Sequence, residues 1–285
     1  MNTSDGNAAT VPPSPPRNAS GLAVRTGTAL IAAPPVVLAI LLGEPVLDAL
    51  VIVCAAIMAW EAARTAWPER GQHPAVAAAL GMGLAVFCLA LGRLDVAGVV
   101  LVGVSVAVLS SYRRRRGPYL AVAMAYIGAA SLAFLWLRAQ PGIGLGLVLW
   151  LVGVVWATDI GALAAGRRIG GARLAPRLSP NKTWAGLAGG VLLAALAGAG
   201  LGAGLPRVGA PVPWVSPGIA AAAAAALALT AQAGDLLESG YKRHFGAKDS
   251  SHILPGHGGV LDRADGLLGA SLALGLAAFV LQGGA

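Results

Sequence analysis

The sequence predicts an all-α, polytopic integral membrane protein, and three observations lead to this fold class. Of the 285 residues, 57% are hydrophobic and only 11% are charged, whereas about a quarter of the residues in a soluble domain are charged. Apolar runs of about 20 residues, the length that crosses a bilayer, recur along almost the whole chain. Short polar segments rich in arginine separate these runs. We therefore expect about nine transmembrane helices, with an active site at the cytoplasmic ends of the C-terminal ones.

The N-terminal stretch differs in composition from the rest of the chain. Residues 1–23 are rich in Pro, Ser, Asn and Thr and lack the apolar core of a signal peptide, so we expect a disordered tail. Residues 24–285 form a single predicted transmembrane domain. Within this domain, residues 159–186 and 234–266 are the two polar motif regions.

Each predicted span is an apolar run judged against the length of about 20 residues that a helix needs to cross the membrane. The spans lie at residues 26–43, 45–65, 75–91, 96–112, 118–137, 143–158, 183–205, 215–234 and 266–281. The first contains Pro34-Pro35, so it is kinked or re-entrant. Many of the spans are rich in Gly and Ala, which favours close contact between helices.

The basic residues predict how the chain is oriented. With these spans, the loops richest in Lys and Arg all fall on one side, which the positive-inside rule assigns to the cytoplasm. They lie at residues 64–70, 113–116, 167–182 and 242–248. We expect a multi-pass protein of the cell (inner) membrane with both motif regions facing the cytoplasm. A net charge of +8 suits anionic membrane lipids and polyanionic substrates; nucleic acid is not an expected partner.

Acidic and basic residues gather at the ends of the C-terminal spans. If the span at 215–234 continues as a helix, then Asp235, Glu238, Ser239 and Lys242 share one of its faces, at positions i, i+3, i+4 and i+7. Carboxylates lie at the ends of the sixth and eighth spans and at the start of the ninth, all on the predicted cytoplasmic side. The predicted topology therefore places them at one depth in the membrane. Ionisable groups near a membrane core are costly and tend to be functional, so we expect a binding site there.

Two motif regions carry a specific resemblance. The first motif consists of Ser239, Lys242-Arg243, Lys248-Asp249, Pro255, His257-Gly258-Gly259, Asp262-Arg263 and Asp265. The second consists of Asp159, Gly161-Ala162, Ser179-Pro180, Lys182-Thr183-Trp184 and Gly186. Together these residues resemble the signature of the phosphatidate cytidylyltransferases, also called CDP-diacylglycerol synthases. The resemblance covers the C-terminal half closely and the first half only as membrane helices.

The resemblance implies a reaction and its partners. A nucleotidyltransferase of this family transfers CMP from CTP to phosphatidic acid and releases pyrophosphate, giving CDP-diacylglycerol for phospholipid biosynthesis. The lipid phosphate is already a nucleophile, so the enzyme mainly positions it and neutralises charge on the leaving group. Mg²⁺, with a second cation as an option, is the expected cofactor. A homodimer is compatible with the sequence.

The resemblance also implies roles for individual side chains. The expected metal ligands are Asp159, Asp235, Asp262 and Asp265. The expected catalytic residues are Asp235, Asp262, Asp265, Lys242, Lys248 and His257. The residues expected to bind substrate are Lys182, Ser179, Thr183, Ser239, Arg243, Arg263, Gly258 and Gly259.

Spacing alone leaves other interpretations open. Asp262 is also placed to cap a helix N-terminus, and the turn at residues 255–259 also suits a plain sharp turn before the last span. Ser179 is placed to cap the helix that opens near residue 183, with Lys182 either facing an anion or reaching up to the membrane interface.

Two rival functions remain. A CTP-dependent kinase of a polyprenol or phytol would use similar groups but would release CDP. A transporter is the second rival, although its charges tend to lie at the middle of the bilayer in internally repeated helices, whereas these lie at the ends of spans and no repeat is visible.

Overall fold

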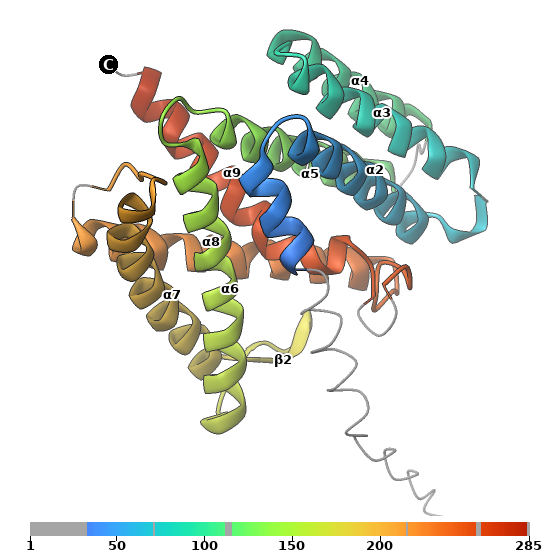
Figure 1. The fold of residues 1–285 in the computed structure, drawn as a ribbon. Coiled ribbons are helices and arrows are strands. Elements are labelled where there is room, and N and C mark those ends of the chain that lie inside the picture. Colours follow the sequence, from blue (N-terminus) through green and yellow to red (C-terminus); the bar gives the residue numbers. More distant parts are fainter. Residues whose placement is uncertain (1–32, 71, 112–115, 215, 255–257, 284–285) are drawn as a thin grey trace, which may run out of the picture.

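In the computed structural model, the described residues are 33–70, 72–111, 116–214, 216–254 and 258–283, and they form helices joined by short connections (Figure 1). The predicted N-terminal tail, residues 1–23, lies outside the described residues. The α-helices are α2 (Val46–Ala66), α3 (His73–Ala90), α4 (Leu94–Ser111), α5 (Gly117–Arg138), α6 (Gly144–Arg168), α7 (Trp184–Gly204), α8 (Pro217–His244) and α9 (Leu261–Gly283). The short elements are η1 (Pro68–Arg70), β1 (Arg173–Ala175), β2 (Ser179–Thr183) and η2 (Leu205–Val208).

The prediction of an all-α, multi-pass membrane protein is confirmed. Within the described residues, 7 helices are long and apolar enough to cross a membrane. Two of the nine predicted spans correspond to shorter apolar helices, Ala33–Leu42 and Leu94–Ser110. Of the first of these spans, residues 26–32 lie outside the described part of the chain.

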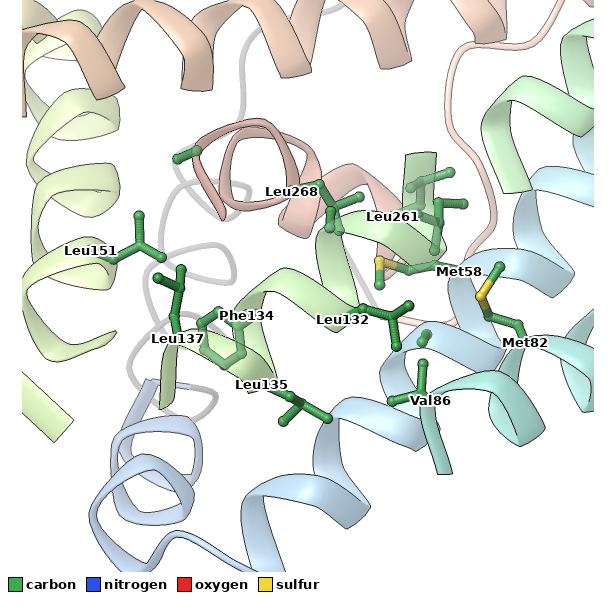
Figure 2. Packing of buried hydrophobic residues seen from close by; sticks show 14 of the residues in the cluster. Met58, Met82, Val86, Leu132, Phe134, Leu135, Leu137, Leu151, Leu261 and Leu268 are labelled. Atoms are coloured by element: carbon green, nitrogen blue, oxygen red, sulfur yellow. The ribbon is translucent and has the colours of Figure 1, made fainter. Parts of the chain in front are cut away.

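Helix α9 joins the two groups of helices that make up the fold. In the first group, α2 packs against α3 and α5, and α4 packs against α3 and α5; in the second, α7 lies between α6 and α8. Helix α9 contacts α8 and α6 on one side and α5 and α2 on the other (Figure 1). Figure 2 shows its Leu261 and Leu268 in one apolar interior with Met58 of α2 and Leu132 of α5.

Small residues let α8 and α9 approach closely, which positions the acidic residues beside them. A Cβ added to Gly234 of α8 would lie 2.5 Å from the carbonyl oxygen of Asp265 and 3.2 Å from Cα of Gly269, both on α9. Such close backbone contact is typical of small residues at membrane helix interfaces. The neighbouring Asp235 is thereby brought beside Asp265.

The connection between α6 and α7 corrects two sequence predictions. The sixth span, predicted to end at residue 158, continues as α6 to Arg168, and the predicted basic loop at residues 167–182 contains an antiparallel hairpin of β1 and β2. Ser179, predicted to cap the next helix, lies in β2 instead. Thr183 is the N-cap of α7, because its Oγ1 accepts a hydrogen bond from the backbone N–H of Gly186 at 3.0 Å.

The tight contact at Gly234 generates a prediction. Gly234→Ala should lower the free energy of unfolding by about 1–3 kcal/mol, because overpacking forces the helices apart. The control is Gly200→Ala in α7, where no atom lies within 4 Å of the added Cβ; it should be neutral or stabilising by about 0.5–1 kcal/mol from helix propensity. Thermal unfolding in detergent measures both. Equal effects of the two substitutions would contradict the close approach.

Candidate active site

Three acidic residues from three different helices converge on one lysine. The three residues are Asp159 of α6, Asp235 of α8 and Asp265 of α9, and their carboxylates lie close enough to repel one another electrostatically. The ammonium group of Lys182, in β2, attracts the carboxylates of Asp159 and Asp265. The Nζ of Lys182 lies 2.6 Å from Oδ2 of Asp235, forming a mostly buried ion pair. The hairpin therefore places Lys182 against α8, close to the carboxylates of α6 and α9.

Two further polar side chains beside this acidic cluster were missed from the sequence. Gln232, buried one turn before Asp235, accepts a hydrogen bond from Lys182 Nζ at 3.0 Å. Tyr126 of α5 interacts electrostatically with Asp265, and its buried hydroxyl has no hydrogen-bond partner within the described residues. The signal available for Gln232 is a lone amide side chain in an apolar span, directly before the motif region that starts at residue 234. No comparable signal marks Tyr126.

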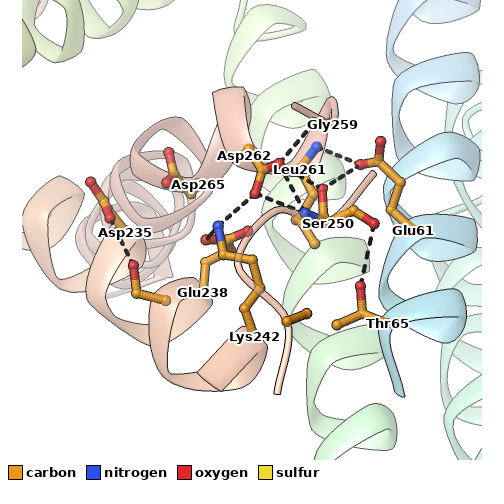
Figure 3. A network of polar contacts seen from close by, with 12 residues as sticks. Glu61, Thr65, Asp235, Glu238, Lys242, Ser250, Gly259, Leu261, Asp262 and Asp265 are labelled. Carbon is orange, nitrogen blue, oxygen red and sulfur yellow. Dashed lines mark hydrogen bonds and ion pairs between the residues drawn. The ribbon is translucent and has the colours of Figure 1, made fainter. Parts of the chain in front are cut away.

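A second network surrounds Lys242, on the same face of α8. Its Nζ lies 2.5 Å from Oε2 of Glu238 and 2.5 Å from Oδ1 of Asp262. Asp262 also accepts hydrogen bonds from the backbone N–H groups of Gly259 (2.8 Å) and Ser250 (3.0 Å) and from the Ser250 hydroxyl (3.0 Å) (Figure 3). Asp262 therefore lies in the first turn of α9 and does not cap it; its carboxylate binds the segment before the helix and remains paired with a lysine of α8.

The prediction that α8 continues past Gly234 with Asp235, Glu238, Ser239 and Lys242 on one face is confirmed. The Ser239 hydroxyl donates to Asp235 Oδ1 at 3.4 Å, and Glu238 pairs with Lys242. Both contacts are between residues four apart, as the helical spacing requires.

The other predicted residues lie around these two networks. Arg263 acts electrostatically on Asp159. Arg243 is exposed and donates to the carbonyl oxygens of Leu178 (3.4 Å) and Ala247 (3.3 Å). Lys248 is exposed, and Gly258 pairs with Leu254 in an isolated bridge. His257 lies outside the described residues.

An acidic residue of α2, Glu61, was also missed. It is completely buried, and it accepts hydrogen bonds from the backbone N–H groups of Val260 and Leu261 at the start of α9. The predicted span at 45–65 has one other acidic residue, Asp48 near its start, so Glu61 is the only acidic residue in the rest of the span. That isolation was the available signal, since an ionisable group inside a span is rarely without a role.

The acidic cluster has the chemistry of a site for a hard cation. Among the described residues, no group of three His, Cys, Asp or Glu side chains is arranged to hold a metal ion by itself. Mg²⁺, however, is held by one or two carboxylates together with substrate phosphates and water. Asp159, Asp235 and Asp265 are carboxylates of this kind that lie near one another, and the Tyr126 hydroxyl beside Asp265 has no hydrogen-bond partner within the described residues.

The fold and these networks define a polytopic membrane protein with a charged site, built where α6, α8 and α9 meet, that suits anionic ligands. The chain belongs to the cytidylyltransferase family, whose model matches residues 23–281. This agrees with the family that the motif residues predicted.

Three similar proteins from different genera share one name. The phosphatidate cytidylyltransferase of Brucella suis biovar 1 (strain 1330) is 44% identical over 183 residues, which cover 64% of this chain and 65% of the relative. The phosphatidate cytidylyltransferase of Bacillus subtilis (strain 168) is 38% identical over 151 residues, 53% of this chain and 54% of the relative. The phosphatidate cytidylyltransferase of Staphylococcus aureus (strain COL) is 39% identical over 148 residues, which cover 52% of this chain and 53% of the relative. The chain thus spans less than two thirds of the length of these relatives.

The network around Lys242 generates a second prediction. Lys242→Met should lower the free energy of unfolding by about 3–5 kcal/mol, because it leaves two buried carboxylates without their cation. Arg93→Met is the control, since Arg93 forms an ion pair with Asp95 in which both side chains are more than half exposed; exposed pairs contribute at most about 1 kcal/mol. Chemical or thermal unfolding in detergent compares the two. A loss no larger for Lys242 than for Arg93 would contradict the structural role of Lys242.

Proposed function

We propose that the protein is a phosphatidate cytidylyltransferase. A phosphate oxygen of phosphatidic acid attacks the α-phosphorus of CTP, the bond from that phosphorus to the oxygen bridging to the β-phosphate breaks, and CDP-diacylglycerol and pyrophosphate form. The observation that carries the proposal is the convergence of Asp159, Asp235, Asp265 and Lys182 from separate elements. Membership of the cytidylyltransferase family and the names of the relatives support the choice of substrates.

The site supplies what this reaction needs. The phosphate nucleophile requires no general base, so catalysis depends on positioning and on charge neutralisation around the leaving pyrophosphate. Lys182 and Arg263 lie among the carboxylates and are the cations best placed to bind phosphate oxygens. Ser239 orients Asp235. We propose that Lys242, held in place by Asp262, is a further cation for phosphate oxygens, and we assign Arg243 and Lys248, on the exposed side, to the approach of the nucleotide.

The lipid substrate fits the surroundings of the acidic cluster. Ile160, next to Asp159, is 62% exposed, and Trp184, close after Lys182, is 57% exposed. Large apolar side chains exposed on membrane helices face lipid, and tryptophan favours the interface. A phospholipid whose chains lie against this surface would present its phosphate at the level of the cluster.

Mg²⁺ is the proposed cofactor, and Asp159, Asp235 and Asp265 are the proposed ligands. When bound, the cation would neutralise charge on the nucleotide phosphates. Asp262 was predicted as a fourth ligand, but its carboxylate already accepts three hydrogen bonds from Gly259 and Ser250 and pairs with Lys242. We therefore propose that Asp262 orients Lys242 and the start of α9.

We further propose that the site faces the cytoplasm at the inner membrane. Contacts tie the predicted cytoplasmic ends to one another: Arg116 Nη1 donates to the Ala66 carbonyl at 3.1 Å, Thr65 Oγ1 to the Ser250 carbonyl at 3.4 Å, and Arg243 to that of Leu178. Arg116 and Arg243 therefore lie at the end of the helices that carries Ser250 and the hairpin, and under the positive-inside rule this supports a cytoplasmic face.

The test of the reaction is an assay of the purified protein in detergent with CTP labelled in the α-phosphate, phosphatidic acid and Mg²⁺. Labelled CDP-diacylglycerol and free pyrophosphate should appear only when all components are present. Asp235→Asn should lower kcat about 100-fold or more, since it removes both a metal ligand and the partner of Lys182. Asp95→Asn, which changes an exposed acid outside the site, should leave turnover unchanged. Release of CDP with phosphorylation of a polyprenol would instead identify a lipid kinase.

The metal assignment generates a separate prediction. Chelation with EDTA should abolish turnover and added Mg²⁺ should restore it. In the Asp265→Asn protein, the Mg²⁺ concentration that gives half-maximal activity should rise about tenfold or more, because one anionic ligand is lost. Turnover that is indifferent to EDTA, or an unchanged Mg²⁺ requirement in the Asp265 variant, would rule out the assignment.

A further inference from the structure

We infer that Glu61 of α2 is a positioning residue for the proposed reaction, acting on Asp262 and Lys242 through the start of α9. The inference rests on the proposed function, and it concerns a residue that lies outside both motif regions. Glu61 comes from the N-terminal half of the chain and lies about 200 residues away in sequence from its main partners.

The contacts of Glu61 are complete and symmetrical. Oε1 accepts from the Ser251 hydroxyl at 2.6 Å and the Val260 N–H at 2.9 Å. Oε2 accepts from the Leu261 N–H at 2.7 Å and the Ser250 hydroxyl at 3.3 Å. Each carboxylate oxygen therefore accepts from one backbone N–H and lies within hydrogen-bond distance of one serine hydroxyl. Figure 3 shows the contacts with Leu261 and Ser250, whose hydroxyl proton Glu61 shares with Asp262.

This arrangement requires a carboxylate rather than an amide. An amide has one acceptor oxygen, and its NH₂ group would have to face the backbone N–H of Val260 or Leu261. All four recorded partners are donors. Negative charge is also favourable at the N-terminus of a helix, where the first N–H groups of α9 have no partner in the helix itself. These hydrogen bonds offset the cost of burying the charge.

A continuous chain of contacts connects Glu61 to the lysine of α8. The Ser250 hydroxyl lies within hydrogen-bond distance of both Glu61 Oε2 and Asp262 Oδ2, and the Ser250 N–H donates to Asp262. Asp262 in turn pairs with Lys242. A Cβ on Gly259 would collide with the Ser250 hydroxyl and with Glu61, so this position is restricted to glycine.

The same part of α2 holds the site at two further points. Thr65, one turn after Glu61, donates to the Ser250 carbonyl at 3.4 Å, and the Tyr241 hydroxyl donates to the Ala62 carbonyl at 2.6 Å. Tyr241 precedes Lys242 directly. The end of α2 is therefore attached both to the segment before α9 and to the end of α8. Among the described residues, Glu61 is the only charged side chain of α2 with a recorded hydrogen bond to these two segments.

The test compares Glu61→Gln and Ser251→Ala with Met82→Ala, which opens a cavity in the buried core of α3. Turnover, KM for CTP and phosphatidic acid, and thermal stability are measured in detergent. For Glu61→Gln we expect kcat to fall about 10- to 100-fold, with both KM values within about threefold, as for other residues that orient a catalytic group. Ser251→Ala should give a smaller loss of the same kind, and Ser251→Thr should restore it. Met82→Ala should lower stability while kcat per folded molecule stays unchanged.

A purely structural role of Glu61 would give a different pattern. Activity per folded Glu61→Gln molecule would then equal that of the unchanged protein, as for Met82→Ala, and this outcome would overturn the inference. If Glu61→Gln does not fold, an unchanged kcat in Ser251→Ala would overturn it. Absence of labelled liponucleotide from the unchanged protein contradicts the proposed function instead. Amide hydrogen exchange at Val260 and Leu261 needs no activity; it should accelerate in Glu61→Gln and not in Met82→Ala.

Discussion

The structure depends on pairing charges that lie at the ends of membrane helices. A carboxylate or ammonium group removed from water is stable only when it is paired or fully hydrogen-bonded. Lys182 with Asp235, Lys242 with Glu238 and Asp262, and Glu61 with its four donors each meet this condition differently. Because most of these partners belong to different elements, satisfying the charges also fixes how α2, α8, α9 and the hairpin are arranged.

Local spacing predicted the fold class and much of the site. The run of apolar spans marks the helices, and the i, i+3, i+4 and i+7 spacing on α8 predicted that Asp235, Glu238, Ser239 and Lys242 share a face. Such patterns are visible because they repeat with the period of a helix. The meeting of Asp159 with Asp235 and Asp265 followed from counting spans, and the contact of α8 and α9 at Gly234 explains how it occurs.

The contacts that the sequence did not reveal are those between distant parts of the chain. Glu61 and Gln232 look like isolated polar residues in apolar runs, and their importance is evident only from partners in other elements. The hairpin of β1 and β2 is short and polar, so no alternation of apolar residues indicates it. Thr183 caps α7 rather than Ser179 because strand pairing takes Ser179 away from the helix, and spacing cannot show this.

The anchoring of α9 by α2 has a consequence for how the chain is divided. Both motif regions lie after α5, so the C-terminal half looks like a self-sufficient catalytic unit. Separated from α2, however, that fragment would lose the carboxylate that accepts from the backbone N–H groups of Val260 and Leu261 and from the Ser251 hydroxyl. The early helices thus complete the proposed site, although the residues that make the family recognisable all come later in the chain.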